Sequence, residues 1–204
     1  MGKKLRKRYY AVKVGRKPGI YKTWDECKAQ VNHFPKNDFK GFDRYEDAYD
    51  YIHPPKVDTF NYEVKAYVDG THDGKSDMAG YAAVLLYNDF KYIIQGKVPT
   101  DSNQIAGETT AAIKAIEKAV EIGAKSIQIY YDYMGIEMWA TSSWKANKDV
   151  SKAYVEFINS VKDAIKIGFV KVKSHSKNIL NDEADMYAKQ AFNRNEVYSC
   201  IKVK

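Results

Sequence analysis

Long apolar runs are absent from this sequence of 204 residues: none approaches the roughly 18 residues that a membrane-spanning helix needs. Cysteine is scarce as well, because Cys27 and Cys200 are the only two, and they stand far apart without the spacing of metal ligands. This excludes a disulfide scaffold or a zinc ribbon and is typical of a reducing compartment. Five basic residues stand among the first eight, but no apolar stretch follows them, so a secretory signal is not expected. We expect a soluble, cytoplasmic protein that is monomeric and has no membrane partner.

Apolar and aromatic residues are numerous enough to form a folded core. With 45% hydrophobic and 14% aromatic residues, the composition excludes intrinsic disorder. The net charge of +7 is uneven, since residues 1–53 hold 13 Lys/Arg against 7 Asp/Glu, whereas residues 54–204 hold 20 against 19. A small basic segment with aromatic residues among its charges is typical of a nucleic-acid-binding module. A basic tail that only keeps the chain soluble is the alternative.

Sequence patterns divide the chain into a first domain at 1–53, a linker at 54–61 and a second domain at 62–204. In the first domain, Thr23 and Glu26 form a capping box that opens a helix. The patterns there predict a small ββαβα module, with strands at 9–14, 20–22 and 39–42 and helices at 24–31 and 45–51.

The second domain is predicted to have an α/β fold with a five-stranded mixed sheet flanked by helices. The expected strands are 64–69, 81–87, 91–98, 126–131 and 168–173, and the expected helices are 104–122, 133–140, 151–165 and 180–193. Three consecutive strands followed by alternating helices and strands favour an antiparallel meander and two further strands parallel to the first. A right-handed crossover then places strand 126–131 beside strand 64–69.

Four carboxylates fall where such a sheet brings them together. Asp69 and Asp132 end the first and fourth strands, and ligands of open α/β sheets bind beyond such strand ends. Glu108 shares a helical face with small residues and is expected to face the sheet. Asp185 follows Asn181, the expected N-cap of the last helix. Each of these residues, taken alone, could also be a solvated acid on the surface. Four negative charges in one crevice repel one another, however, and require cations to neutralise them.

Oxygen ligands in an open site favour magnesium (Mg²⁺), with Mn²⁺ as the alternative. Two such ions about 3.5–4 Å apart clamp the attacking and leaving oxygens of a phosphodiester. His175 lies in a loop ten residues before Asp185, where an imidazole can move protons or assist product release. An inert surface histidine is the alternative.

The first domain carries a resemblance in the run YYAVKVGRKPGIYKTWDECKAQVNHFPKNDFKGF, residues 9–42. This run resembles the hybrid-binding, viroplasmin-like domain at the amino terminus of many type 1 ribonucleases H. The resemblance implies that Tyr10, Trp24 and Phe39 pack on the DNA strand of an RNA–DNA hybrid. It also implies that basic positions, namely Arg16, Lys17 and Lys40, lie near the RNA strand or the phosphates. A core role for Trp24 and Phe39 is the alternative.

The second domain resembles the catalytic domain of type 1 ribonuclease H over nearly all of 62–193. The matching segments are YVDGT (67–71), AGETTAA (106–112), YYDYMGIEMWA (130–140) and HSKNILNDEAD (175–185). The resemblance implies a catalytic and metal-binding set of Asp69, Glu108, Asp132 and Asp185, with His175 as an additional catalytic residue. It further implies that Asn103 and Gln104 read the RNA minor groove. The long basic protrusion of many members, after Trp139, is short here.

These patterns together predict a magnesium-dependent endoribonuclease that cuts the RNA strand of RNA–DNA hybrids by a two-metal mechanism. The expected products carry 3′-hydroxyl and 5′-phosphate ends. A DNA-directed nuclease on the same fold is one alternative. The other is a non-catalytic protein that binds RNA–DNA hybrid or double-stranded RNA.

Overall fold

The chain divides into two compact units, Met1–Thr59 and Phe60–Lys204, each with its own sheet. A computed structural model describes residues 7–54, 58–172, 178–194 and 196–203. Residues 55–57 of the predicted linker lie outside the described residues. Among the residues described, no helix has the length and apolar character needed to cross a bilayer.

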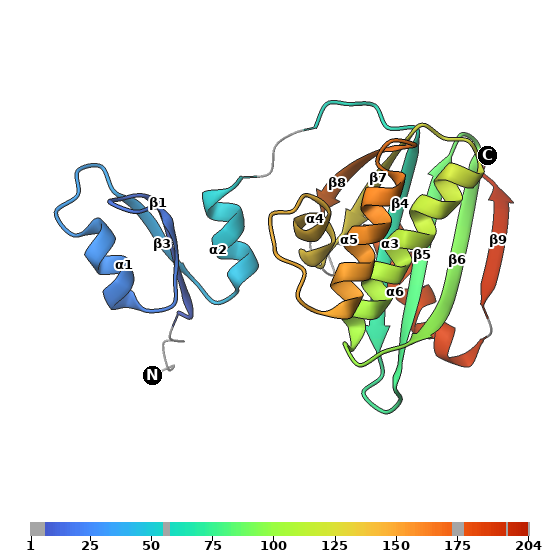
Figure 1. Cartoon of the computed structure of the whole chain (residues 1–204), viewed down its shortest axis with the longest axis horizontal. Coiled ribbons are helices and arrows are strands. Elements are labelled where there is room, and N and C mark those ends of the chain that lie inside the picture. The colour runs from blue at the N-terminus through green and yellow to red at the C-terminus, as the bar shows by residue number, and fades with distance from the viewer. Residues whose placement is uncertain (1–6, 55–57, 173–177, 195, 204) are drawn as a thin grey trace. The chain divides into compact units, whose positions relative to one another are not determined.

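The first unit is a three-stranded antiparallel sheet with a helix on each side (Figure 1). Its elements are β1 Tyr9–Val14, β2 Gly19–Tyr21, α1 Trp24–Val31, β3 Asp38–Phe42 and α2 Tyr45–Ile52, with sheet order β2-β1-β3. The predicted capping box is confirmed, because the Thr23 hydroxyl accepts from the Glu26 amide while the Glu26 carboxylate accepts from the Thr23 amide. Val12 packs on Cys27 and Val31 of α1, so the first helix is fixed to the central strand.

The second unit is built on a six-stranded mixed sheet of order β8-β7-β4-β5-β6-β9. Its strands are β4 Val64–His72, β5 Met78–Tyr87, β6 Phe90–Pro99, β7 Ser126–Tyr131, β8 Lys166–Lys171 and β9 Val197–Lys202. Its helices are α3 Gln104–Glu121, α4 Gly135–Ala140, α5 Asp149–Val161, α6 Ile179–Gln190 and the 3-10 turn η1 Ala191–Asn193. Strand β7 is parallel to β4 and lies beside it, as predicted.

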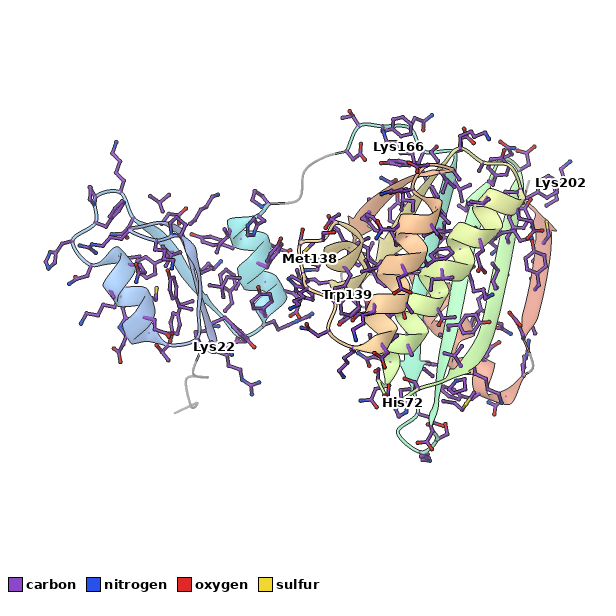
Figure 2. All side chains as sticks on the ribbon, in the orientation of Figure 1. Lys22, His72, Met138, Trp139, Lys166 and Lys202 are labelled. Atoms are coloured by element: carbon purple, nitrogen blue, oxygen red, sulfur yellow. The ribbon has the colours of Figure 1, made fainter. Side chains whose placement is uncertain are left out.

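Helices cover both faces of this sheet (Figure 1). The main core packs α3 and α5 against one face, through side chains such as Ala66, Ala115 and Tyr154. On the other face, Ala184 of α6 packs with Tyr67 and Val84. Figure 2 labels His72 at the end of β4 and Lys166 at the start of β8, at opposite ends of the sheet. The carboxyl ends of β4 and β7 therefore meet at the His72 end.

The sheet differs from the sequence prediction in several strand bounds, such as β8, which was predicted at 168–173, and in two larger details. The sheet has a sixth strand, β9, which pairs antiparallel with β6 and which the five-strand prediction missed. Strand β4 also continues past Asp69 to His72, so the prediction that Asp69 ends its strand was wrong. The reason is that Asp69 still pairs with Ala82 of β5, whereas the parallel pairing with β7 extends only to Tyr67. Asp69 thus lies beyond the parallel part of the sheet.

Three glycines let α3 approach the sheet closely at its first turns. A Cβ atom on Gly107 would lie 2.3 Å from the carbonyl oxygen of Gly80 and 2.9 Å from Cα of Gly70. A Cβ atom on Gly70 would lie 2.1 Å from the amide nitrogen of Glu108. No side chain fits at these separations, so the backbone of α3 rests directly on β4 and β5. This contact brings Glu108 next to Asp69.

Gly107→Ala is expected to lower the free energy of unfolding by roughly 1–3 kcal/mol, because the added methyl meets backbone atoms that cannot rotate away. Urea titration followed by circular dichroism measures this loss. The matched control is Gly41→Ala in the first unit, where the nearest atoms belong to the flexible side chain of Lys7. If both variants unfold at the wild-type urea concentration, the close approach of α3 does not constrain the fold.

Candidate active site

Three carboxylates from three different elements converge beside the carboxyl ends of β4 and β7. Asp69 lies in β4, Glu108 lies in α3, and Asp132 follows β7 directly. Each offers one oxygen atom, and these oxygens all lie within 4.8 Å of one another. Asp69 is 8% exposed and Glu108 is 3% exposed. The structure therefore brings together three of the four carboxylates that the sequence singled out.

Asp185 reaches the same site from α6, on the other face of the sheet. Its charge and a side-chain hydrogen bond with Asp69 are among the causes that raise the pKa of Asp69. Its Oδ2 atom accepts a hydrogen bond of 2.7 Å from Nζ of Lys189, one helical turn further on. Asp185 thus lies next to the three-carboxylate cluster, and Lys189 partly neutralises the charge of Asp185. Sequence analysis missed Lys189, although its spacing of four residues from Asp185 was a usable signal.

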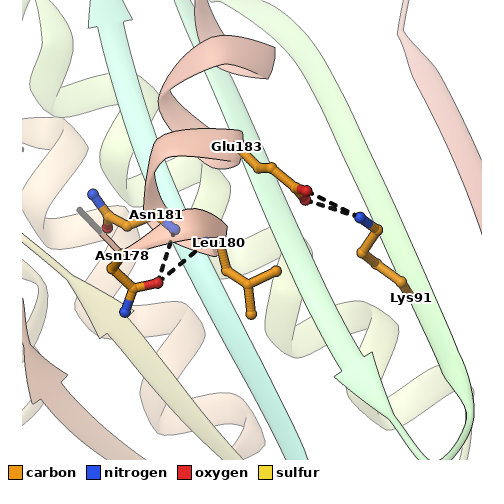
Figure 3. Close-up of polar contacts among 5 residues, drawn as sticks. All are labelled: Lys91, Asn178, Leu180, Asn181 and Glu183. Carbon is orange, nitrogen blue, oxygen red and sulfur yellow. Dashed lines mark hydrogen bonds and ion pairs between the residues drawn. The ribbon is translucent and has the colours of Figure 1, made fainter. Parts of the chain in front are cut away.

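Helix α6 is held in place by contacts that do not involve the predicted site residues (Figure 3). The side chain of Asn178 accepts from the amides of Leu180 and Asn181, so the N-cap is Asn178, and the prediction of Asn181 as the cap was wrong. Asn181 is instead buried on the helix. Nζ of Lys91 on β6 lies 3.2 and 3.0 Å from the two carboxylate oxygens of Glu183. This ion pair fixes α6 to the sheet. Glu183 is therefore engaged with Lys91, whereas Asp185 of the same helix faces Asp69.

Burial makes this cluster costly to ionise. Burial raises the pKa of Asp69 to about 8, and the charges of Asp132 and Asp185 add to the shift. Burial, followed by the charges of Asp69 and Asp132, raises the pKa of Glu108 well above its ordinary value. Oε2 of Glu108 is buried and has no hydrogen-bond partner among the described residues. An unpaired buried carboxylate oxygen beside two further carboxylates is the arrangement that a hard divalent cation satisfies.

The stability of the metal-free protein is expected to fall as pH rises from about 4 to about 8, since Asp69 titrates near 3.8 when unfolded and near 8 when folded. In this interval the folded chain holds a proton that the unfolded chain has lost, so each rise in pH favours unfolding. The raised pKa of Glu108 acts in the same direction. Melting temperatures measured in EDTA at several pH values test this expectation against Asp69→Asn. The variant should melt above the wild type at pH 8 and close to it at pH 4, and a constant difference would contradict it.

The residues predicted to contact RNA lie at the rim of this cluster. Asn103 caps α3 with a positive φ of 53°, and both Asn103 and Gln104 are exposed. The carbonyl oxygen of Gln104 lies close to Gly70, directly after Asp69. The first turn of α3 therefore lies beside the segment that carries Asp69. His175 falls in the segment 173–177, outside the described residues.

The first unit presents a continuous aromatic surface. The ring centroids of Tyr10 and Trp24 lie 5.6 Å apart, and those of Trp24 and Phe39 lie 5.7 Å apart. Trp24 is 43% exposed and Phe39 is 36% exposed, so neither belongs to the buried core. Lys40 follows Phe39 and is also exposed. This surface, Tyr10–Trp24–Phe39, is accessible to a ligand with flat faces.

The basic residues before α1 differ in their surroundings. The Arg16 guanidinium donates to the carbonyl oxygens of Ala29 and Asn32, at 3.1 and 2.7 Å, at the carboxyl end of α1. Arg16 thus stabilises the end of this helix, a role that sequence analysis did not anticipate. Lys17 is exposed, and its carbonyl oxygen accepts from the hydroxyl of Tyr21.

Comparison with known proteins identifies relatives of both units. Residues 8–52 match the family described as Ribonuclease H1 N-terminal domain, and residues 61–193 match the family described as RNase H. Human Ribonuclease H1 is 25% identical over 259 aligned residues, which cover 92% of this chain and 90% of the human protein. A Ribonuclease H from Wolbachia sp. subsp. Drosophila simulans is 29% identical over 140 residues, which cover 63% of this chain and 94% of that protein.

Solved structures share the fold of the second unit. RNase H1 from the halophilic archaeon Halobacterium salinarum has a TM-score of 0.52 at 23% identity and covers 64% of this chain and 97% of its own. LC11-RNase H1, solved in complex with RNA/DNA hybrid, has a TM-score of 0.52 at 18% identity and covers 63% of this chain and 99% of its own. These similarities show that the second unit has the same fold as these structures.

Proposed function

Because the chain belongs to the ribonuclease H family and begins with a ribonuclease H1 N-terminal domain, we propose that it hydrolyses the RNA strand of RNA–DNA hybrids. The observation that carries the proposal is the convergence of Asp69, Glu108 and Asp132 within 4.8 Å on the sheet of this family. Human Ribonuclease H1 and this chain align over nearly their full lengths, and LC11-RNase H1 was solved with an RNA/DNA hybrid. Both relatives support hybrid as the substrate.

The acidic cluster is suited to hold divalent cations, for which we propose two Mg²⁺ ions, with Mn²⁺ as the alternative. Asp69 and Glu108, both buried, would be the inner ligands, and Asp132 and Asp185 would complete the set from β7 and α6. Bound ions of this kind supply an activated water and stabilise the charge on a departing oxygen. We propose that the bond broken joins the phosphorus to the 3′ oxygen, which leaves 3′-hydroxyl and 5′-phosphate ends.

Residues around the cluster would then choose and orient the RNA strand. Asn103 and Gln104 are exposed, the carbonyl oxygen of Gln104 lies close to Gly70, and their side-chain amides can donate to and accept from 2′-hydroxyls in the minor groove. We propose that His175 accepts or delivers a proton as product leaves. Since DNA lacks the 2′-hydroxyl, these contacts would direct cleavage to the RNA strand.

The first unit would bind the other strand of the hybrid. Bases and sugars stack on exposed aromatic rings, and the Tyr10–Trp24–Phe39 surface offers three in a row. Lys17 and Lys40 would contribute salt-dependent contacts with phosphates. Arg16 would do so only with the atoms that are not engaged at the end of α1.

One cleavage assay tests the proposed function. Labelled RNA–DNA hybrid, duplex RNA and duplex DNA are each incubated with the protein, with Mg²⁺ or with EDTA. We expect cleavage of the RNA strand of the hybrid alone, only when Mg²⁺ is present, and with 3′-hydroxyl ends. Cleavage of duplex DNA would instead support a DNA-directed nuclease. Binding of the hybrid without any cleavage would support a non-catalytic binding protein.

Trp24→Ala is expected to weaken hybrid binding by roughly 1–3 kcal/mol, the usual contribution of a stacked base. Because Trp24 is 43% exposed, the variant should stay folded and its metal requirement should not change. Fluorescence anisotropy with a labelled hybrid measures the affinity, and circular dichroism checks the fold. Val14→Ala, at another exposed apolar residue of the same unit, is the control. A folded Trp24→Ala protein with unchanged affinity would rule out the stacking role.

A further inference from the structure

Two tyrosines form a stacked pair at the last ladder pair of β4 and β7. Tyr67 of β4 and Tyr130 of β7 are direct partners in the parallel ladder. Their ring centroids lie 4.4 Å apart, with 12° between the ring planes. Tyr67 is 8% exposed, whereas Tyr130 is half-buried and its hydroxyl donates to Oε1 of Gln128 at 2.8 Å. The pair is therefore well ordered within the sheet.

This pair closely precedes two of the carboxylates along the two strands. Side chains two residues apart on a strand lie on the same face, about 7 Å apart. Asp69 follows Tyr67 by two residues within β4, so its carboxylate stands one step beyond the Tyr67 ring on the same face. Asp132 lies two residues after Tyr130, just past the end of β7, and its carboxylate lies within 4.8 Å of that of Asp69. The β4–β7 pairing ends with the two tyrosines. The ring stack thus accompanies the last β4–β7 ladder pair before the two carboxylates.

The stack also contacts the element that carries Asp185. Ala184 of α6 belongs to the same buried cluster as Tyr67 and Val84, and Tyr130, Leu180 and Tyr187 pack against it. The cluster therefore joins β4, β7 and α6, which carry Asp69, Asp132 and Asp185. Glu108 is positioned independently, through the glycine contacts of α3 on the opposite face.

We propose that Tyr67 and Tyr130 are positioning residues, whose stacked rings set the separation of Asp69 and Asp132 and thereby the affinity of the site for its divalent cation. The proposal rests on the function proposed above, because it concerns the same site. The separation of the rings, 4.4 Å, is close to the spacing of about 4.8 Å between neighbouring strands. The rings can therefore reinforce the strand spacing at the last ladder pair, from which both strands continue to their carboxylates.

Tyr130→Leu tests this role, because it removes one ring from the half-buried side of the stack. Mg²⁺ is titrated alone, and its binding is read from the rise in melting temperature and from calorimetry, neither of which needs catalysis. Mutation of a residue that orients a metal ligand typically lowers metal affinity by about 10–100-fold. We therefore expect the Mg²⁺ concentration at half-maximal binding, the Mg²⁺ midpoint, to rise at least ten-fold. Tyr130→Phe and Tyr67→Phe keep both rings and should keep the wild-type midpoint.

Tyr187→Leu is the matched control, since Tyr187 packs on the same cluster but is not part of the stack. It should lower the melting temperature without changing the Mg²⁺ midpoint. An unchanged midpoint in Tyr130→Leu, or an equal shift in Tyr187→Leu, would overturn the proposal. Tyr67→Leu provides the same test from β4 if Tyr130→Leu does not fold. Failure of the wild type to cleave hybrid, with the predicted midpoints observed, would reject the proposed function and leave the positioning role standing.

Discussion

Asp69→Asn is expected to reduce hybrid cleavage in Mg²⁺ by more than ten-fold, a rise in barrier of about 1.4 kcal/mol or more. Asp69 is the buried carboxylate that both Asp132 and Asp185 approach, so the loss of its charge would remove a proposed metal ligand from the centre of the set. Hybrid binding should stay nearly unchanged, because the aromatic surface that we assign to binding lies in the other unit. Single-turnover cleavage and anisotropy in EDTA measure the two quantities separately.

Asp182→Asn is the control for this variant. Asp182 is an exposed acid in the first turn of α6, and it does not belong to the three-carboxylate cluster. The Asp182→Asn variant should cleave hybrid at the wild-type rate. A rate for Asp69→Asn above about one tenth of the wild type would contradict the assignment of Asp69 as a metal ligand. The melting temperature of Asp69→Asn shows whether the variant is folded and so separates a loss of activity from a folding defect.

A fragment consisting of residues 60–204 is expected to keep the chemistry but to lose most of the affinity for hybrid. Residues 54–204 have a net charge of only +1, and the basic segment after Trp139 contains only Lys145, Lys148 and Lys152 up to Ala153. Such a domain releases few counterions from nucleic acid. Its KM should rise by about ten-fold or more, equivalent to about 1.4 kcal/mol, while its rate at saturating hybrid stays close to that of the full chain.

The salt dependence of binding separates this explanation from simple damage to the fragment. The slope of log K against log salt should be shallower for the fragment, by about one unit for each phosphate contact that is lost. The fragment with Asp69→Asn should be inactive, which would show that the remaining activity comes from the same site. Equal KM values and equal salt slopes for fragment and full chain would mean that the first unit has another role.

The local patterns of the sequence were reliable where one short segment decided the outcome. Strand Tyr9–Val14, helix Trp24–Val31 and strand Ser126–Tyr131 have the bounds that the sequence predicted. Gly123 follows the C-cap Ile122 of helix α3 and has a φ of 79°, the left-handed conformation that favours glycine after a helix. These features depend on neighbouring residues, through alternation, capping and glycine conformation, and neighbours in sequence are visible without a fold.

Errors arose where a distant segment decided the outcome. Strand β9 has few buried residues and exists because β6 offers an open edge, with which residues Val197–Lys202 pair. Strand β4 continues past Asp69 because β5 supplies partners there. Asn178 caps α6 although Asn181 stands three residues later in the same polar segment, and the geometry of the first turn selects between them. Partners of this kind cannot be seen from either segment alone.

The sequence by itself determined the family, the α/β fold class and the candidates for the acidic set, since each depends on residue types at fixed spacings. Only the tertiary structure decided how these acids are related. It placed Asp69, Glu108 and Asp132 within 4.8 Å, paired Asp185 with Lys189, and stacked Tyr67 on Tyr130 at the last ladder pair of β4 and β7. The physical reason is that the distance between two carboxylates, and the burial that raises their pKa values, depend on how β4, α3, β7 and α6 pack, and packing joins residues that the sequence keeps far apart.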